Sequence, residues 1–184
     1  MLDIEDDYLL QIGKISVLYE YVNYEIKDFI RKIYKIEISN NIEVNIKLEK
    51  LSSERLHNLY KKTIKNIIST PNDFLKDITI EETLKDLFKR LSRVRECRND
   101  IIHGYCAKVN FTKSNICEVK VENTEKYISF GSGFILKIIS LDGLHRIVTD
   151  LIELQQIVQN VNYILRKQKH YLEFKDFFVL YVSI

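Results

Sequence analysis

The chain has 184 residues, enough for one domain with a substantial buried core, and its 46% hydrophobic and 29% charged residues exclude a disordered protein. Its formal net charge of +2 is too small to indicate a nucleic-acid-binding protein by itself, so the distribution of charge is more informative. One proline and five glycines leave few breaks in the chain, which favours long helices over a many-turned sandwich.

Targeting signals and metal sites are not expected. The start, MLDIEDDYLL, is acidic and lacks the basic beginning and apolar core of a secretory signal. No apolar run approaches the roughly 18 residues that a membrane span needs. Cys97, Cys106 and Cys117 are odd in number and widely spaced, which indicates reduced thiols. We therefore expect a cytoplasmic protein with no membrane partner, no metal and no cofactor.

The first predicted helix covers residues 6–36, with two acidic residues, Asp6 and Asp7, at its amino end. Its apolar residues recur every three or four positions: Leu10, Leu18, Tyr21, Val22, Phe29, Ile30 and Ile33. SNN at 39–41 breaks the pattern. IEVNIKL at 42–48 alternates, so it favours neither a helix nor a strand clearly.

Two further helices are predicted before the middle of the chain. Ser52 or Ser53 can cap the second one, which ends at STPND, residues 69–73. Thr79 and Glu82 have the spacing of a capping box for the third helix. The third helix has one apolar stripe, formed by Leu84, Leu87, Phe88, Leu91 and Val94.

A change of period follows this helix. Short alternating runs at 107–111, 116–122 and 126–130 predict a small antiparallel meander, and 134–140 is a further candidate strand. From Asp142 onward, apolar residues at helical spacing predict a long last helix. The expected fold is mostly α: a single domain over 1–184, with four to five helices in an up-and-down bundle and a β insertion at about 106–140.

The segment RECRNDIIHGYC, residues 95–106, interrupts an otherwise ordinary amphipathic pattern. If the third helix continues through it, Asn99 and His103 lie one turn apart on one face. Arg98 then points about 100° away from Asn99, toward the apolar side of the helix. A guanidinium there requires an ion pair or an interface, because an unpaired buried charge is costly. Gly104 is the expected end of the helix.

The same helix carries a dense run of positive charge. KRLSRVRECR, residues 89–98, has five basic residues and one acid, which suits a phosphate backbone. Candidate RNA-binding residues are Lys89, Arg90, Arg93 and Arg95, although Arg95 could equally form a surface salt bridge. The other histidines, His57, His145 and His170, are isolated and are expected to be surface or boundary residues.

Arginine and histidine together can cleave a phosphodiester without a metal. The 2′-hydroxyl of RNA would be the nucleophile, His103 would carry protons, and Arg98 would stabilise charge developing on phosphorus. Asn99 could contact the imidazole of His103 and is the third candidate catalytic residue. The residue types also fit a salt-bridged structural Arg98 and a helix-end His103 stabilised by the macrodipole.

Arg98, Asn99, three further residues and His103, followed by Gly104, resemble the signature of the HEPN superfamily. RNDIIHGY also matches a variant with tyrosine two residues after the histidine, found in HEPN toxins paired with minimal nucleotidyltransferase antitoxins. The motif covers residues 98–105, and the helical layout extends the likeness to the rest of the chain except residues 106–140. That insertion departs from the compact toxins.

This resemblance implies a homodimer whose motif helices meet in one composite cleft that cleaves RNA without a metal. Such proteins act as toxins or in phage defence. It also implies that Tyr105 is a target for a nucleotidyltransferase-like antitoxin, although a plain interface or core tyrosine is an open alternative. A second reading is a non-catalytic dimer that binds RNA or a partner protein.

Overall fold

The computed structural model describes residues 6–36, 42–69, 78–103, 107–109, 127–130 and 137–167. Within these ranges there are five helices: α1 (Asp6–Ile33), α2 (Ile42–Glu49), α3 (Ser53–Ser69), α4 (Ile78–His103) and α5 (Leu141–Lys167). The predicted mostly helical bundle is confirmed for this part of the chain. The ambiguous 42–48 segment is helical.

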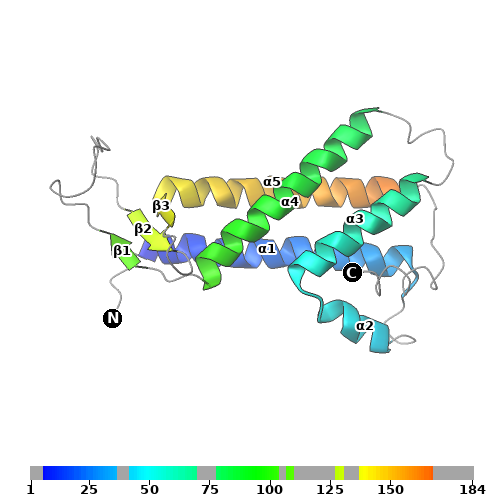
Figure 1. Cartoon of the computed structure of the whole chain (residues 1–184), viewed down its shortest axis with the longest axis horizontal. Helices are drawn as coiled ribbons and strands as arrows, with labels where there is room; N and C mark the ends of the chain where they lie inside the picture. Colours follow the sequence, from blue (N-terminus) through cyan, green and yellow to red (C-terminus); the bar gives the residue numbers. More distant parts are fainter. Residues whose placement is uncertain are drawn as a thin grey trace.

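The long helices form a bundle in which α1 and α5 lie side by side (Figure 1). The helices α1, α3 and α5 run in the same direction, and α4 runs back across them at an oblique angle (Figure 1). The carboxyl end of α4 crosses α1, so the last turns of α4 pack against the first half of α1. This crossing positions the segment that the sequence singled out.

Three short strands lie between α4 and α5 in the sequence. They are β1 (Ala107–Val109), β2 (Tyr127–Phe130) and β3 (Lys137–Ser140), paired antiparallel in the order β1-β2-β3. Residues 110–126 and 131–136 lie outside the described part of the chain. The predicted strand at 116–122 falls there, so the four-strand meander stays a prediction.

The helix ends follow local backbone chemistry. Helix α1 stops where Lys35 adopts a left-handed backbone with φ 49°, and Ile36 N–H donates to the Arg31 carbonyl at 2.8 Å. Ser52 caps α3 through its hydroxyl, which accepts from Arg55 N–H at 3.4 Å. Ser140 does the same for α5, accepting from Gly143 N–H at 3.1 Å. Helix α4 is already helical at Ile78, one residue before the predicted cap.

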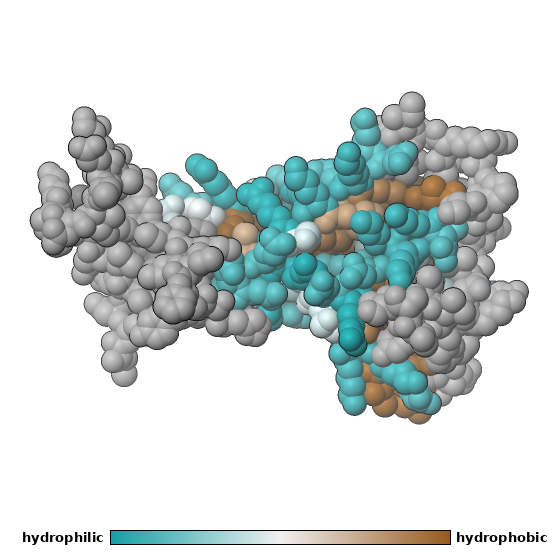
Figure 2. Space-filling view, viewed as in Figure 1, coloured by the Kyte–Doolittle hydropathy of each residue, from teal (hydrophilic) through white to brown (hydrophobic). Residues whose placement is uncertain are grey.

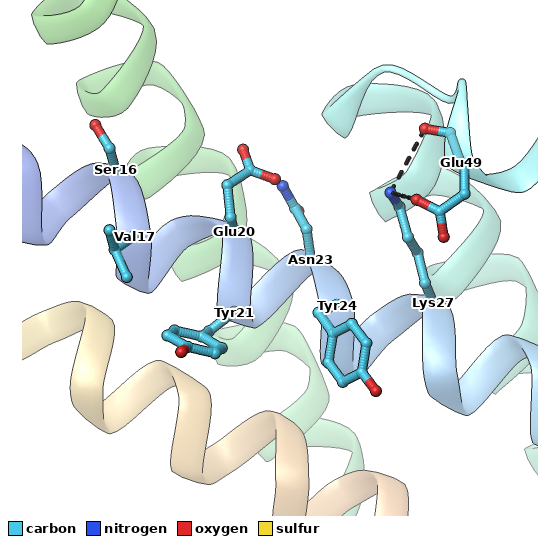
Figure 3. A pocket seen from close by; sticks show the side chains of 8 residues that line it. All are labelled: Ser16, Val17, Glu20, Tyr21, Asn23, Tyr24, Lys27 and Glu49. Carbon is cyan, nitrogen blue, oxygen red and sulfur yellow. Dashed lines mark hydrogen bonds and ion pairs between the residues drawn. The ribbon is translucent and has the colours of Figure 1, made fainter.

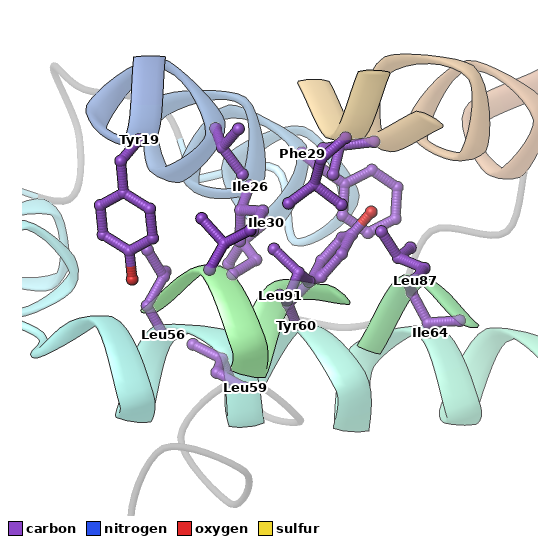
Figure 4. Packing of buried hydrophobic residues seen from close by; sticks show 14 of the residues in the cluster. Tyr19, Ile26, Phe29, Ile30, Leu56, Leu59, Tyr60, Ile64, Leu87 and Leu91 are labelled. Atoms are coloured by element: carbon purple, nitrogen blue, oxygen red, sulfur yellow. The ribbon is translucent and has the colours of Figure 1, made fainter. Parts of the chain in front are cut away.

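Tyr60 is a point where the four long helices meet (Figure 4). Its ring packs edge-on against Phe29 of α1 at 5.5 Å and Phe88 of α4 at 6.1 Å. Its hydroxyl donates to Asn162 Oδ1 of α5 at 2.7 Å, and Asn162 Nδ2 donates to the Glu25 carbonyl at 3.1 Å. These groups, the Tyr60 cluster, link α1, α3 and α5 through buried hydrogen bonds.

The apolar stripe predicted for the first helix is partly wrong. Leu10 and Tyr21 are 53% and 54% exposed, whereas Ile15 and Ile26, which the stripe left out, are buried. The reason is that α1 packs against α3, α4 and α5 at once, so its buried face is set by three neighbours. Figure 2 shows hydrophobic residues, in brown, between hydrophilic residues, in teal, on one face of the molecule.

Among the described helices, none combines the length and the apolar character that a membrane crossing requires.

Candidate functional site at the end of α4

Arg98 and Asn99 lie on the last turns of α4, and the described helix ends at His103. Positions 98 and 103 are five residues apart, which places them about 140° apart around the helix axis. The side chain of His103, and Gly104, Tyr105 and Cys106, lie outside the described part of the structure. The geometry of the motif can therefore be followed from Arg98 and Asn99.

The Arg98 guanidinium packs against the first half of α1. Its Cζ lies over the Tyr19 ring, 5.6 Å from the centroid, and its Nη2 is 3.7 Å from Glu20 Oε1. Nη1 donates to Asn99 Oδ1 at 3.4 Å. The predicted ion pair is thus present, with Glu20 as the partner. Both polar contacts are long for a charged donor, which normally bonds at about 2.7–2.9 Å.

Behind Arg98 lies a group of polar side chains that we call the Tyr19 cluster: the buried Tyr19, Asn23 and His57, and the half-buried Ser53. His57 Nε2 is 3.0 Å from Asn23 Oδ1, and Asn23 Nδ2 donates to Ser53 Oγ at 3.4 Å. The Tyr19 and His57 rings meet edge-on at 6.1 Å. The prediction that His57 is a surface or boundary residue is wrong, because it is 7% exposed and therefore buried. His145, by contrast, is exposed as predicted, and His170 lies outside the described residues.

His57 is neutral in the folded protein. Burial, and then the positive charge of Arg95, lower the pKa of His57 from 6.5 to about 4. Because Asn23 Oδ1 accepts a hydrogen bond, His57 Nε2 carries the proton and Nδ1 has the lone pair. Nδ1 is buried and makes no hydrogen bond within the described part of the chain. A buried acceptor without a donor costs stability, so among the described residues this ring is less completely hydrogen-bonded than its burial favours.

The Tyr19 hydroxyl resembles His57 Nδ1 in its hydrogen bonding. It is buried and makes no hydrogen bond of good geometry to any described group. Burial raises the pKa of Tyr19, against smaller opposite effects of Ser53 and of the nearby arginines Arg95 and Arg98. The ring is therefore a neutral surface under the Arg98 guanidinium.

The structure divides the basic run of α4 among three directions. Arg95, 20% exposed, lies on the same side as Arg98, with Nη1 3.9 Å from Glu54 Oε1 of α3. Arg90 faces α5, where Nη2 is 2.9 Å from Glu153 Oε2 and 3.6 Å from Asp150 Oδ1. Lys89 and Arg93 are exposed. Arg95 and Arg98 are thus brought together, and Arg90 is directed toward another helix.

An open groove of about 540 Å³ lies beside this site, between α1 and the end of α2 (Figure 3). Glu20, the partner of Arg98, lines it, and the ion pair of Lys27 Nζ with Glu49 Oε2, 2.7 Å long, stands at its α2 side. Tyr21 and Tyr24, which also line it, are 54% and 60% exposed. The Glu20 carboxylate therefore both lines the groove and forms the ion pair with Arg98.

Sequence reasoning missed the Tyr19 cluster. A signal was present for His57, which precedes Tyr60 by three residues and Ile64 by seven, so it falls beside the buried stripe of its helix. No comparable signal marked Tyr19, because its contact with Arg98 joins two helices far apart in the sequence.

Comparisons of this chain with models of protein families, with curated proteins and with solved structures gave no match.

Proposed function

We propose that this protein is a HEPN-type endoribonuclease that cleaves RNA without a metal, acting as a toxin or phage-defence effector. The observation that carries the proposal is the environment of Arg98, on the last turns of a long helix in a helical bundle. The Arg98 side chain is 21% exposed, and its contacts with Glu20 Oε1 at 3.7 Å and Asn99 Oδ1 at 3.4 Å are long. Such contacts can be exchanged for the oxygens of a phosphate.

The chemistry follows from the residue types. The 2′-oxygen attacks phosphorus as its proton passes to one His103, and the bond from phosphorus to the 5′-oxygen breaks as that oxygen takes a proton from another His103. Arg98 stabilises the extra negative charge on the phosphorus oxygens. The products are a 2′,3′-cyclic phosphate and a 5′-hydroxyl. The two His103 side chains come from two copies of the chain, which together form one cleft.

The partners in this proposal are RNA, a second copy of the chain and a nucleotidyltransferase-like antitoxin acting on Tyr105. Arg95, adjacent to Arg98 on the same side of α4, would extend the phosphate contact. Exposed Lys89 and Arg93 would add to the basic surface. The insertion at about 106–140 and a cytoplasmic location belong to the same proposal.

The experiment is RNA cleavage by purified wild type and His103→Ala in excess EDTA, with size-exclusion light scattering on the same samples. The wild type should cut RNA and leave cyclic phosphate ends. His103→Ala should be slower by about 10²–10⁴-fold while remaining a dimer, because it loses general acid–base catalysis. An oligonucleotide with a 2′-deoxy substitution at the cut site should resist. Cleavage that chelation abolishes, or that His103→Ala retains, would refute the proposal.

A second candidate function is a non-catalytic helical dimer that binds RNA or a protein. The contacts of Arg98 with Tyr19 and Glu20 of its own chain favour it, because a structural arginine would make the same contacts. In this case the wild type never cuts RNA, even at high concentration, and Arg98→Ala changes dimerisation or binding.

A further inference from the structure

We propose that Tyr19 of α1 is a positioning residue, which holds the Arg98 guanidinium in the orientation that contacts the scissile phosphate, and that Glu20 is an exchangeable counter-ion, which the phosphate displaces. The inference deepens the proposed function, and its catalytic consequence rests on that function. The orientation itself can be measured without any cleavage.

Tyr19 supplies a fixed face. Its side chain points from α1 toward α3 (Figure 4) and is 1% exposed, so its ring has little freedom to move. The ring also packs edge-on against His57, which is itself tied to Asn23. A guanidinium carbon 5.6 Å from the ring centroid is within the range of a cation–π contact. The buried cluster thus holds the surface on which Arg98 rests.

The face contact suits an arginine that binds phosphate. A guanidinium that stacks on a ring presents the edges of its planar fork to hydrogen-bond acceptors. A lysine would lack both the stacking plane and the fork, so the site depends on arginine. Tyr19 therefore lies under the guanidinium without competing for its N–H groups.

Glu20 supplies an exchangeable partner. Its side chain is 61% exposed, and its carboxylate is 3.7 Å from Nη2, longer than a charged hydrogen bond. A carboxylate presents oxygens much as a phosphate does, so Glu20 balances the charge of Arg98 until a phosphate replaces it. Because Glu20 also lines the groove beside α2, displaced Glu20 has open space to enter.

The first test observes Arg98 directly. The side-chain N–H and CδH₂ resonances of Arg98, identified by their change in Arg98→Lys, should show a ring-current shift in the wild type. The shift should persist in Tyr19→Phe, which keeps the ring, and vanish in Tyr19→Leu and Tyr19→Met. Wild-type Arg98 resonances without a ring-current shift would overturn the proposal, even if the Leu and Met variants fail to fold.

The second test measures the catalytic consequence on folded dimers. Tyr19→Leu should lower kcat by about tenfold with little change in KM, as expected for loss of a desolvated cation–π contact, and Tyr19→Phe should restore the rate. Glu20→Gln should lower KM by about twofold, because a competitor for the guanidinium is gone. Tyr163→Leu is the matched control, since it removes another ring in cation–π contact, with Lys167 at 4.5 Å.

The outcomes separate the two proposals. An intact ring-current shift with no RNA cleavage by wild type would refute the proposed function and leave Tyr19 as the support of Arg98. Cleavage by wild type that Tyr19→Leu does not slow, beyond the effect of Tyr163→Leu, would refute the catalytic role of Tyr19. A KM raised by Glu20→Gln would refute the exchange of Glu20 for phosphate.

Discussion

Two buried polar clusters involve α1, and they differ in how completely their groups are hydrogen-bonded. In the Tyr60 cluster, the Tyr60 hydroxyl and the Asn162 amide form a continuous chain from α3 through α5 to the Glu25 carbonyl of α1. In the Tyr19 cluster, the Tyr19 hydroxyl and His57 Nδ1 are buried and make no hydrogen bond of good geometry to the described residues. Two arginines, Arg95 and Arg98, adjoin only this second cluster.

The difference separates two physical roles. A satisfied network holds helices in register and specifies one packing, whereas a partly satisfied one costs stability. Proteins tolerate such costs mainly where a site requires them. The Tyr60 cluster therefore reads as structural. The Tyr19 cluster lies directly beneath Arg98, which fits the functional role proposed above.

The largest expected effect that distinguishes the clusters is a loss of stability in acid. His57 has a pKa of about 4 in the folded protein and 6.5 as its ordinary value, so the unfolded chain binds the proton first. The contribution is fully present above pH 6.5 and is lost as the pH falls from 6.5 to about 4, by about 3 kcal/mol. Urea unfolding of wild type and His57→Gln across this window should show a steeper decline for wild type.

The acid effect also has a direct check in the folded state. An NMR titration of the His57 ring protons in the folded protein should give a midpoint well below 6.5. A midpoint near 6.5, or parallel urea curves for the two proteins, would mean that the cluster does not hold His57 neutral.

The next largest effect is a difference in unfolding free energy between two matched substitutions, Tyr60→Phe and Tyr19→Phe. Tyr60 and Tyr19 are 0% and 1% exposed, and Tyr→Phe removes one hydroxyl from each. Tyr60→Phe leaves Asn162 Oδ1 without its donor and should destabilise the fold by about 1–3 kcal/mol. Tyr19→Phe removes a hydroxyl that makes no hydrogen bond of good geometry among the described residues, so it should change the stability by less than about 1 kcal/mol. Equal losses in chemical denaturation would remove the distinction between the clusters.

The smallest effect concerns Arg90. Its ion pairs with Glu153 and Asp150 are partly exposed, so Arg90→Gln should cost less than about 1 kcal/mol. Since Arg90 is engaged with α5, its removal should also weaken RNA binding less than Arg93→Gln does. Filter binding at two salt concentrations measures this, and a larger loss for Arg90→Gln would return it to the RNA-binding surface.

Much of the helical layout could be predicted because it depends on local patterns. The long helices have apolar residues at helical spacing, and Ser52 is a recognisable cap. Arg98 was expected on the apolar side of its helix, in need of a partner, and Glu20 is that partner. That prediction follows from the rotation of about 100° per residue in a helix and from the free-energy cost of burying an unpaired charge.

The remaining features depend on contacts between distant segments. Neither glycine nor asparagine stands at position 35, so the sequence does not indicate a left-handed residue there, and the predicted helix over 6–36 extends beyond the observed end of α1 at Ile33. The α2 segment alternates like a strand, but Lys27 and Arg31 of α1 hold Glu49 at its carboxyl end. The contact of Tyr19 with Arg98 joins two helices that are far apart in the sequence.

The most direct test of the account is single-turnover RNA cleavage in excess EDTA by wild type, Arg98→Ala and Arg166→Ala, with urea stability measured on the same samples. Arg166 is the matched control, because its Nη1 forms an ion pair of the same length, 3.7 Å, with Asp28 on α1. We expect Arg98→Ala to lose cleavage by at least about 10²-fold with its fold retained, as loss of a charge-stabilising donor predicts, and Arg166→Ala to cleave like wild type. Equal cleavage by Arg98→Ala and Arg166→Ala would contradict a functional role for Arg98.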